Sequence, residues 1–261
     1  MAPSNDHFPL WLAMADHGLM LDFTGFHPVD FPQDANKIDD NLSVRIRALA
    51  DIISAQNFPY ITEIVPSLTR LFIAFDTDII TSDGVKQALL PFLSQANSQK
   101  SVAGRKWCLP ICYDGDCAPD LQDVAERTGL SPEQVIDRHL AKTLSVSVMG
   151  FMPGLGYMTG VDSRLTLPRR ANPRTNVPER SVGIAMGQCV IYPLESPGGW
   201  NLIGRISYPL FDPTRQTPIL LRAGDEVRFT RITESELSNQ EDAYTSGDFT
   251  SADLADGTAH D

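Results

Sequence analysis

The sequence predicts an α+β protein in which a small N-terminal α/β sandwich is followed by a C-terminal β-barrel. In the first half, strand-like and helix-like apolar patterns alternate. Beyond residue 143 the chain contains short strand-like runs separated by turn signals, which is typical of a barrel or a sandwich. A polar stretch without periodicity at 96–105 separates the two patterns and is expected to be a linker. We therefore expect domains at 1–98 and 102–232.

The N-terminal domain is predicted to contain three strands and two helices. The strands lie at 20–23, 60–65 and 70–75, and the helices lie at 41–56 and 84–95. The first helix repeats apolar residues at helical spacing, at Leu42, Ile46, Leu49 and Ile53. Asp40 or Asn41 can cap its N-terminus, because a short polar side chain satisfies a free backbone N–H there.

The C-terminal domain is predicted to begin with a strand at 109–113 and a pair of short helices. Pro119 opens the first helix and Gly129 closes it. Ser131 caps the second helix, with Pro132 at its first position and Gln134 completing a capping box. Five further strands follow at 144–149, 181–186, 189–192, 201–206 and 226–232, with turns at 187–188 and 224–225.

Charge is distributed unevenly along the 261 residues. Residues 233–261 hold eight acidic residues and no lysine or arginine, so they supply −8 of the net charge of −12 and the body supplies −4. We expect this acidic tail to be disordered, because it lacks apolar periodicity. The acidic balance disfavours nucleic-acid binding. With no run of about 18 apolar residues and no basic leader, we expect no membrane span and a cytoplasmic protein.

Several common sites are disfavoured by spacing. The helix pair at 119–140 resembles a helix-turn-helix, but its second helix carries Glu133 and Asp137 against Arg138, and acids repel phosphates. Cys108, Cys112 and Cys117 lack the paired spacing of structural zinc sites, so no metal is expected. No phosphate-binding loop of the P-loop type and no biotin-carrier lysine segment are present.

The candidate site lies between residues 150 and 205, where glycine and proline force tight turns and expose backbone N–H groups. A stiff segment at 168–178 has prolines at every fifth position. Five arginines accompany it with a single acid: Arg164, Arg169, Arg170, Arg174 and Arg180. Guanidinium groups on a rigid backbone suit carboxylate or phosphate recognition.

Two further features accompany this segment. The segment Ser196-Pro197-Gly198-Gly199-Trp200 has two interpretations. Ser196 as a nucleophile is disfavoured, because no nucleophile elbow or histidine partner is evident. Contact of an anion with the backbone N–H groups of Gly198 and Gly199 is the better explanation. His139 shares the apolar face of its helix with Val135, so it can point inward toward the glycine-rich turn and act in proton transfer or hydrogen bonding.

These segments resemble the carboxyltransferase subdomain C and D family. That family contains the B-type subunit of 5-oxoprolinase, the first subunit or half-module of allophanate hydrolase and urea carboxylase proteins, and an inhibitor of a sporulation histidine kinase. The resemblance rests on 150–158, on the Pro-Arg repeats within 168–178, on 181–184 and on 196–205, and it runs from about residue 18 to residue 232. Upstream, 119–121, 129–131 and 135–139 also match. Leu155, Met158 and Arg180 depart from the usual pattern, since the family often has glycine at the last of these.

The resemblance implies a cyclophilin-like C-terminal barrel and an ATP-dependent amide or lactam hydrolase. The most similar activity is that of 5-oxoprolinase, which converts 5-oxoproline, ATP and water into glutamate, ADP and phosphate. ATP, with Mg²⁺, would be bound together with partner subunits, and no biotin is expected on this chain. The implied partners are a homologous second barrel subunit, like the C-type subunit of 5-oxoprolinase, and a third, lactam-processing subunit, like its A-type subunit.

The resemblance also implies roles for individual residues. His139, Arg169 and Arg174 are expected to be catalytic, with the arginines contacting an anion and the histidine transferring a proton. Substrate and anion binding is expected at Pro153, Gly154, Tyr157, Arg170, Ser196, Gly198, Gly199, Trp200 and Arg205. Two alternative functions stay open: a regulatory protein that inhibits a histidine kinase, and a half-module of a urea carboxylase or allophanate hydrolase system.

Overall fold

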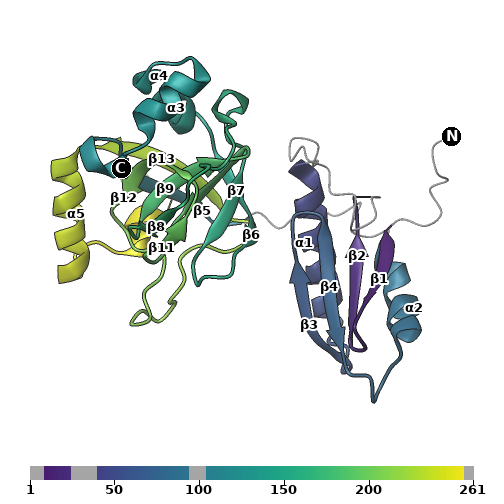
Figure 1. The fold of residues 1–261 in the computed structure, drawn as a ribbon. Helices are drawn as coiled ribbons and strands as arrows, with labels where there is room; N and C mark the ends of the chain where they lie inside the picture. The colour runs from purple at the N-terminus through teal and green to yellow at the C-terminus, as the bar shows by residue number, and fades with distance from the viewer. Residues whose placement is uncertain (1–8, 25–39, 94–103, 256–261) are drawn as a thin grey trace. The chain divides into compact units, whose positions relative to one another are not determined.

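The computed structural model describes residues 9–24, 40–93 and 104–255, with the side chains of 40 and 41 left aside. The chain divides into two compact units, one up to Val102 and one from Ala103 onward. Each unit is described by itself (Figure 1). Most of the expected linker lies outside the described residues, and so do the side chains of Asp40 and Asn41, on which the expected helix cap depends. In the described part, no helix is both long enough and apolar enough to cross a membrane.

The N-terminal unit is a four-stranded antiparallel sheet with two helices. Its strands, in spatial order, are β1 (Leu10–Met14), β2 (Gly18–Asp22), β4 (Arg70–Phe75) and β3 (Ile61–Pro66). Helices α1 (Asp40–Ala55) and α2 (Ser82–Leu93) complete it. One buried cluster joins Leu71 and Ile73 of the sheet to Leu49 of α1 and Leu89 of α2. The α/β sandwich expected here is confirmed, although β1 was not predicted.

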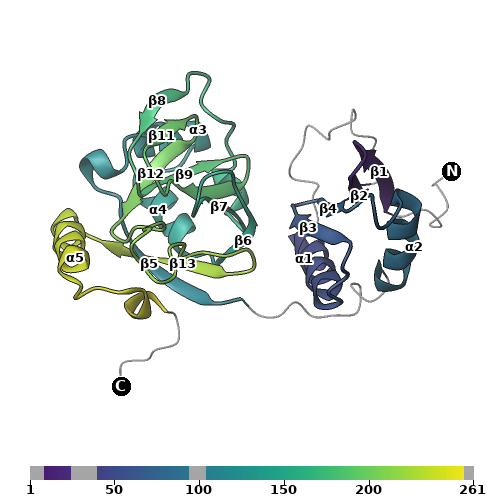
Figure 2. The ribbon, with the colours of Figure 1, turned by 90° about the horizontal axis from the view of Figure 1, so that it is seen from below.

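The C-terminal unit is built around a closed barrel of seven strands, which confirms the predicted fold class. In order around the barrel, the strands are β10 (Gln188–Ile191), β7 (Gly156–Thr159), β6 (Leu144–Met149), β13 (Glu226–Ile232), β5 (Lys106–Cys112), β12 (Asn201–Ile206) and β9 (Ser181–Ala185). The β5–β13 pair is parallel, and the other pairs are antiparallel. Figure 2 shows the barrel strands as a ribbon around a common interior. Buried side chains such as Ile111, Val146 and Ile203 belong to the core of this unit.

Two short helices flank the barrel strands. Helix α3 (Leu121–Thr128) ends at Gly129, whose φ of 67° is the left-handed conformation that glycine adopts without cost. Helix α4 (Pro132–Leu140) begins with the predicted capping box, in which Ser131 and Gln134 satisfy each other's backbone N–H groups. Helix α3 contacts β12, and α4 contacts β13. Two short 3-10 turns, η4 (Gly115–Cys117) and η5 (Ser163–Leu165), lie in the connections.

A separate two-stranded sheet is formed by the two segments that carry most of the candidate site. Strand β8 (Arg174–Val177) pairs antiparallel with β11 (Ser196–Gly198). Neither strand was predicted: β11 contains Pro197 and Gly198, which are rare in strand interiors, and β8 is flanked by Pro173 and Pro178. Proline is tolerated here since each strand pairs on one side only.

The expectation of a disordered acidic tail was wrong for residues 233–255. Helix α5 (Glu234–Ser246) begins with a capping box of Thr233 and Glu236, ends at Gly247 and is followed by a 3-10 turn, η6 (Ser251–Leu254). Leu237 and Leu254 are buried against the barrel, with exposed fractions of 4% and 1%. The tail therefore has enough capping and apolar contact to fold as part of the second unit. Residues 256–261 lie outside the described part.

Candidate functional site

The arginine-proline segment and the Ser196–Trp200 segment form one surface. In the β8–β11 pair, Ser196 lies opposite Val177 and Gly198 lies opposite Arg174. The backbone N–H of Arg170 donates a hydrogen bond of 2.7 Å to the carbonyl of Gly199. Two motifs about 25 residues apart in sequence are thus held together by backbone contacts. We refer to residues 169–177 and 196–200 as the hairpin site.

A buried carboxylate, Asp120, organises the arginines of the hairpin site. Its Oδ1 accepts hydrogen bonds from Arg170 Nη1 at 2.6 Å and from Arg174 Nη2 at 2.7 Å. Its Oδ2 accepts from Arg174 Nη1 at 2.8 Å and from the backbone N–H of Leu202 at 2.7 Å. We call these four bonds the Asp120 clamp. Because the Asp120 side chain is only 4% exposed, the clamp is a mostly desolvated and charge-assisted contact.

The clamp determines how much positive charge the site offers. Two guanidinium groups share one carboxylate, so the clamp carries a net charge of +1 (+2 from the arginines and −1 from Asp120). Hydrogen bonds with Asp120 raise the pKa of Arg174 above its ordinary value. Arg170 and Arg174 retain 31% and 25% of their side-chain exposure. They are therefore positioned by Asp120 and still reach the surface.

An aromatic wall supports the same surface. The guanidinium carbon of Arg169 lies 5.3 Å from the centre of the Trp200 ring, a cation–π distance. Tyr157, from the glycine-rich turn, packs beside Trp200 with ring centres 5.9 Å apart. Trp200 is 5% exposed, whereas Arg169 is exposed. Arg169 is therefore stacked on a fixed ring and has its charge directed toward solvent.

Gly198 is required by its contact with Tyr192. A Cβ atom at position 198 would lie 2.2 Å from the Tyr192 hydroxyl oxygen, so a larger residue cannot fit without displacing that ring. Burial raises the pKa of Tyr192. The hydroxyl thus stays protonated at neutral pH beneath the hairpin site.

The glycine-rich turn lies against the same structure. Gly154 has φ of 85°, and a Cβ atom there would come within 3.3 Å of the Leu210 carbonyl and of Phe211. Pro153 and Gly154 therefore form the tip of a turn that packs against Leu210, Phe211 and Pro193. Phe151, at the same turn, is 86% exposed. In the described part of the chain, Ser196 Oγ is shielded from solvent and has no hydrogen-bond partner.

Arg205 is engaged by the tail instead of by Asp120. Its Nη2 lies 3.1 Å from Glu241 Oε1 on α5, and the same oxygen accepts from Arg180 Nη1 at 2.9 Å. Arg180 has φ of 66°, a left-handed conformation that glycine adopts more easily than arginine does. The strain of an arginine there is offset in part by the contact with α5.

His139 is buried inside the barrel, with an exposed fraction of 1%. Its Nδ1 lies 2.7 Å from the Tyr113 hydroxyl, its Nε2 lies 3.7 Å from Cys189 Sγ, and its ring stacks on Phe229. Burial lowers its pKa to about 4, so the ring is neutral near pH 7. The structure therefore brings together Arg169, Arg170 and Arg174 with the glycines and Trp200, whereas His139 and Arg205 have other partners.

Sequence reasoning missed Asp120 as a site residue. An acidic residue at the start of a helix predicts an N-cap, and the partners of Asp120 lie 50 and 54 residues away. Although Asp120 precedes α3, its side chain makes no capping bond. The available signal was the excess of arginines over acids at 164–180, because part-buried arginines need a carboxylate from elsewhere.

Comparisons with known proteins identify a matching family and similar sequences. The sequence matches the family of the carboxyltransferase domain, subdomain C and D, over residues 27–221. It is 36% identical over 210 residues to the B-type 5-oxoprolinase subunit of Bacillus subtilis (strain 168), a match covering 77% of this chain and 88% of that protein. It is 50% identical over 121 residues to the B-type 5-oxoprolinase subunit of Escherichia coli O157:H7, covering 46% of this chain and 56% of that protein.

A solved structure shows the same fold in a larger protein. The urea amidolyase of K. lactis superposes with a TM-score of 0.73 at 20% identity, covering 96% of this chain and 16% of that chain. At this identity the likeness shows the fold alone. The chain spans just over half of the E. coli protein and about a sixth of the urea amidolyase.

Proposed function

We propose a function from one premise: the chain belongs to the family of the carboxyltransferase domain, subdomain C and D. We propose that it is the B-type subunit of an ATP-dependent 5-oxoprolinase, which opens the lactam of 5-oxoproline to give glutamate. The observation that carries this proposal is the 36% identity to a B-type 5-oxoprolinase subunit over 88% of that protein. We propose that the chain works together with two partners, a homologous second barrel subunit plus a third subunit.

In this proposal, Arg169 is the anion-contacting residue of the chain. Its guanidinium is exposed and stacked on Trp200, whereas Arg170 and Arg174 are already paired with Asp120. The Asp120 clamp is therefore a positioning element that fixes the backbone around Arg169, Gly198 and Gly199. Positioned guanidinium groups and backbone N–H groups stabilise charge that develops on carboxylate, phosphoryl or oxyanion oxygens.

The charge of the hairpin site bears on ATP binding. Arg169, Arg170 and Arg174 contribute +3 and Asp120 contributes −1, which leaves a net +2. A nucleoside triphosphate carries more negative charge than this, so metal ions and cations from a partner protein have to balance the rest. The three arginines and Asp120 therefore fit a site that makes some of the contacts to the phosphates of ATP, while partner subunits make the others. When bound, ATP would activate the lactam oxygen so that it can act as a leaving group.

His139 has a supporting role in this proposal. Its ring nitrogens face Tyr113 and Cys189, and its low pKa leaves little protonated form near pH 7. A proton donor for the reaction needs a pKa near the working pH and access to substrate. We therefore propose that His139 orders the barrel interior and that the transferred proton comes from another group of the assembly.

The experiment is an assay of ATP-dependent glutamate release with this chain and its two partner subunits. We expect Arg169→Gln to lower kcat/KM about tenfold to a hundredfold, because one charge-assisted contact contributes about 1.5–3 kcal/mol. Arg169→Lys should recover part of the loss. Arg164→Gln is the matched control, since Arg164 is an exposed arginine on η5 in the same segment of the chain.

Each outcome separates one alternative. Equal activity in Arg169→Gln and wild type would retain the 5-oxoprolinase proposal and remove Arg169 from the site. A folded and partnered protein that releases no glutamate would contradict the proposal. It would favour a urea or allophanate half-module if one of those amides were turned over. If no amide were turned over and autophosphorylation of a histidine kinase were suppressed, the kinase-inhibitor function would be favoured.

A further inference from the structure

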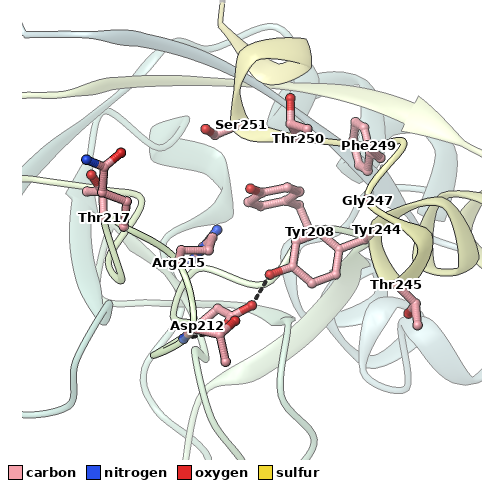
Figure 3. A pocket seen from close by; sticks show the side chains of 12 residues that line it. Tyr208, Asp212, Arg215, Thr217, Tyr244, Thr245, Gly247, Phe249, Thr250 and Ser251 are labelled. Atoms are coloured by element: carbon pink, nitrogen blue, oxygen red, sulfur yellow. Dashed lines mark hydrogen bonds between the residues drawn. The ribbon is translucent and has the colours of Figure 1, made fainter.

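A second concave site lies between the tail and the segment that follows β12. It is a pocket of about 830 Å³. One wall is the segment 208–217, and the other is 244–251, at the end of α5 and the turn after it. Figure 3 shows Arg215, Tyr208 and Ser251 around the same open space. The second wall lies beyond residue 221, where the family match ends, and the pocket shares no lining residue with the hairpin site.

Both walls are held in place by hydrogen bonds. The 208–217 segment is closed by a bridge between Phe211 and Ile219 and by a bond of 2.9 Å from the Asp212 N–H to the Pro218 carbonyl. The tail is fixed by a bridge between Ala255 and Trp107. The pocket is therefore formed before any ligand arrives, which lowers the entropic cost of binding.

Arg215 offers unused hydrogen-bond donors to this pocket. Its guanidinium carbon lies 5.2 Å from the centre of the Tyr208 ring, which holds the group in a fixed orientation. Its Nη2 donates one bond of 2.9 Å to the Pro218 carbonyl. In the part of the chain that the structure describes, this is the only hydrogen bond of the Arg215 side chain. A guanidinium has five N–H donors, so at least one remains for a ligand.

The one carboxylate of the pocket lining already accepts three hydrogen bonds from protein donors. Asp212 Oδ1 accepts from the Thr214 N–H at 2.8 Å and from Thr214 Oγ1 at 2.6 Å, and Oδ2 accepts from the Tyr244 hydroxyl. The bonds from Thr214, followed by the one from Tyr244, lower the pKa of Asp212 to about 2, so it is ionised at neutral pH. Among the described contacts Asp212 makes no ion pair with Arg215; its carboxylate is held by these three donors, and the nearby charge of Arg215 also favours its ionised form.

We propose that this pocket binds a small monoanionic carboxylate whose body is a ring or a short apolar chain. Arg215 would take the carboxylate, and Phe249, whose ring packs edge-on against the buried Tyr208, would contact the body of the ligand. Thr217 and Ser251 add hydroxyl groups at the rim. A phosphate dianion is a poorer fit, because the pocket holds one cation and the negative charge of Asp212 lies nearby. This inference does not rest on the proposed catalytic activity.

In the experiment, the full chain alone is titrated separately with 5-oxoproline, L-glutamate and inorganic phosphate. Binding is measured by isothermal titration calorimetry and by shifts of the backbone amide resonances. We expect one carboxylate to bind with a dissociation constant on the order of 1 mM, as contact with one part-buried guanidinium allows. Arg215→Gln should weaken this binding at least tenfold, and Arg215→Lys should weaken it less. Arg164→Gln is the matched control and should leave it unchanged.

A second variant tests the pocket without touching the arginine. Thr217→Trp places a bulky side chain at an exposed position of the rim and should block binding while the melting temperature stays the same. The proposal would be overturned by the absence of saturable carboxylate binding in the wild type, or by equal binding in Arg215→Gln. It would also be overturned if Arg169→Gln abolished binding while Arg215→Gln did not, or if phosphate bound better than both carboxylates.

Discussion

The Asp120 clamp predicts a large and specific loss of stability on Asp120→Asn. The substitution keeps the size of the side chain but removes its charge, and it replaces one accepting oxygen by an NH₂ group. Each oxygen of Asp120 accepts two hydrogen bonds, so two of the four are lost. The NH₂ group then faces N–H donors in a site that is only 4% exposed.

The magnitude follows from the kinds of bond lost. A hydrogen bond to a charged partner contributes about 1.5–3 kcal/mol, and breaking a fully buried ion pair costs about 3–5 kcal/mol. Because the two arginines keep a quarter to a third of their exposure, water can solvate them in part. We therefore expect the free energy of unfolding of the second unit to fall by about 3 kcal/mol. For a unit of this size, that corresponds to a decrease of about 6–12 °C in melting temperature.

The assay is differential scanning calorimetry of the full chain, which separates the transitions of the two units. Asp123→Asn is the matched control: Asp123 lies on α3, is 50% exposed and pairs with Arg127 at 3.0 Å. A surface pair of this kind contributes less than about 1 kcal/mol. The reasoning would be refuted if Asp120→Asn lowered the stability by less than about 1 kcal/mol, or no more than Asp123→Asn did.

Three further predictions concern other parts of the second unit. Gly198→Ala should lower the melting temperature, because overpacking against Tyr192 costs about 1–3 kcal/mol. Adding Tyr192→Phe to the same chain should restore part of the lost stability, and the absence of any rescue would contradict the contact. Glu241→Gln should speed amide hydrogen exchange across α5, because Glu241 pairs with Arg180 and Arg205, whereas Asp242→Asn should not. Equal exchange rates in the two variants would argue against anchoring of the helix by Glu241. The pKa of His139 is lowered to about 4 from 6.5, so the unfolded chain binds the extra proton. Stability should therefore be full above about pH 6.5 and fall by up to about 3 kcal/mol toward pH 4. In urea unfolding, the His139→Gln variant should lack this dependence of stability on pH. An unchanged pH dependence would mean that other groups cause it.

Local signals predicted much of the fold. The capping box of Ser131 and Gln134 and the left-handed end at Gly129 were recognised because all the interacting groups lie within a few residues. Six of the seven barrel strands were found where apolar runs met turn residues, and β7 (Gly156–Thr159) was missed because it follows the glycine-rich turn directly. The tail helix was missed although Thr233 and Glu236 form a capping-box pattern, since its composition alone suggests disorder.

The parts that were missed depend on contacts distant in sequence. Strands β8 and β11 form because they pair with each other. Considered alone, the proline and glycine within β11 and the prolines on both sides of β8 argue against strands. Asp120 was not recognised because its arginine partners lie at least 50 residues away. The tail is held by the pairing of Glu241 with Arg180 and Arg205, which no local pattern reveals. Sequence patterns located the segments of the site but not the carboxylate that connects them.

The most direct test of the proposed function is an omission experiment with the three-component assembly. This chain and its two purified partners, the second barrel subunit plus the third subunit, are mixed with 5-oxoproline, Mg²⁺ and ATP. Glutamate is then measured with each component left out in turn. The account predicts glutamate release in step with ATP hydrolysis only when this chain and both partners are present. Equal release without this chain, or none with all three folded and associated, would contradict it.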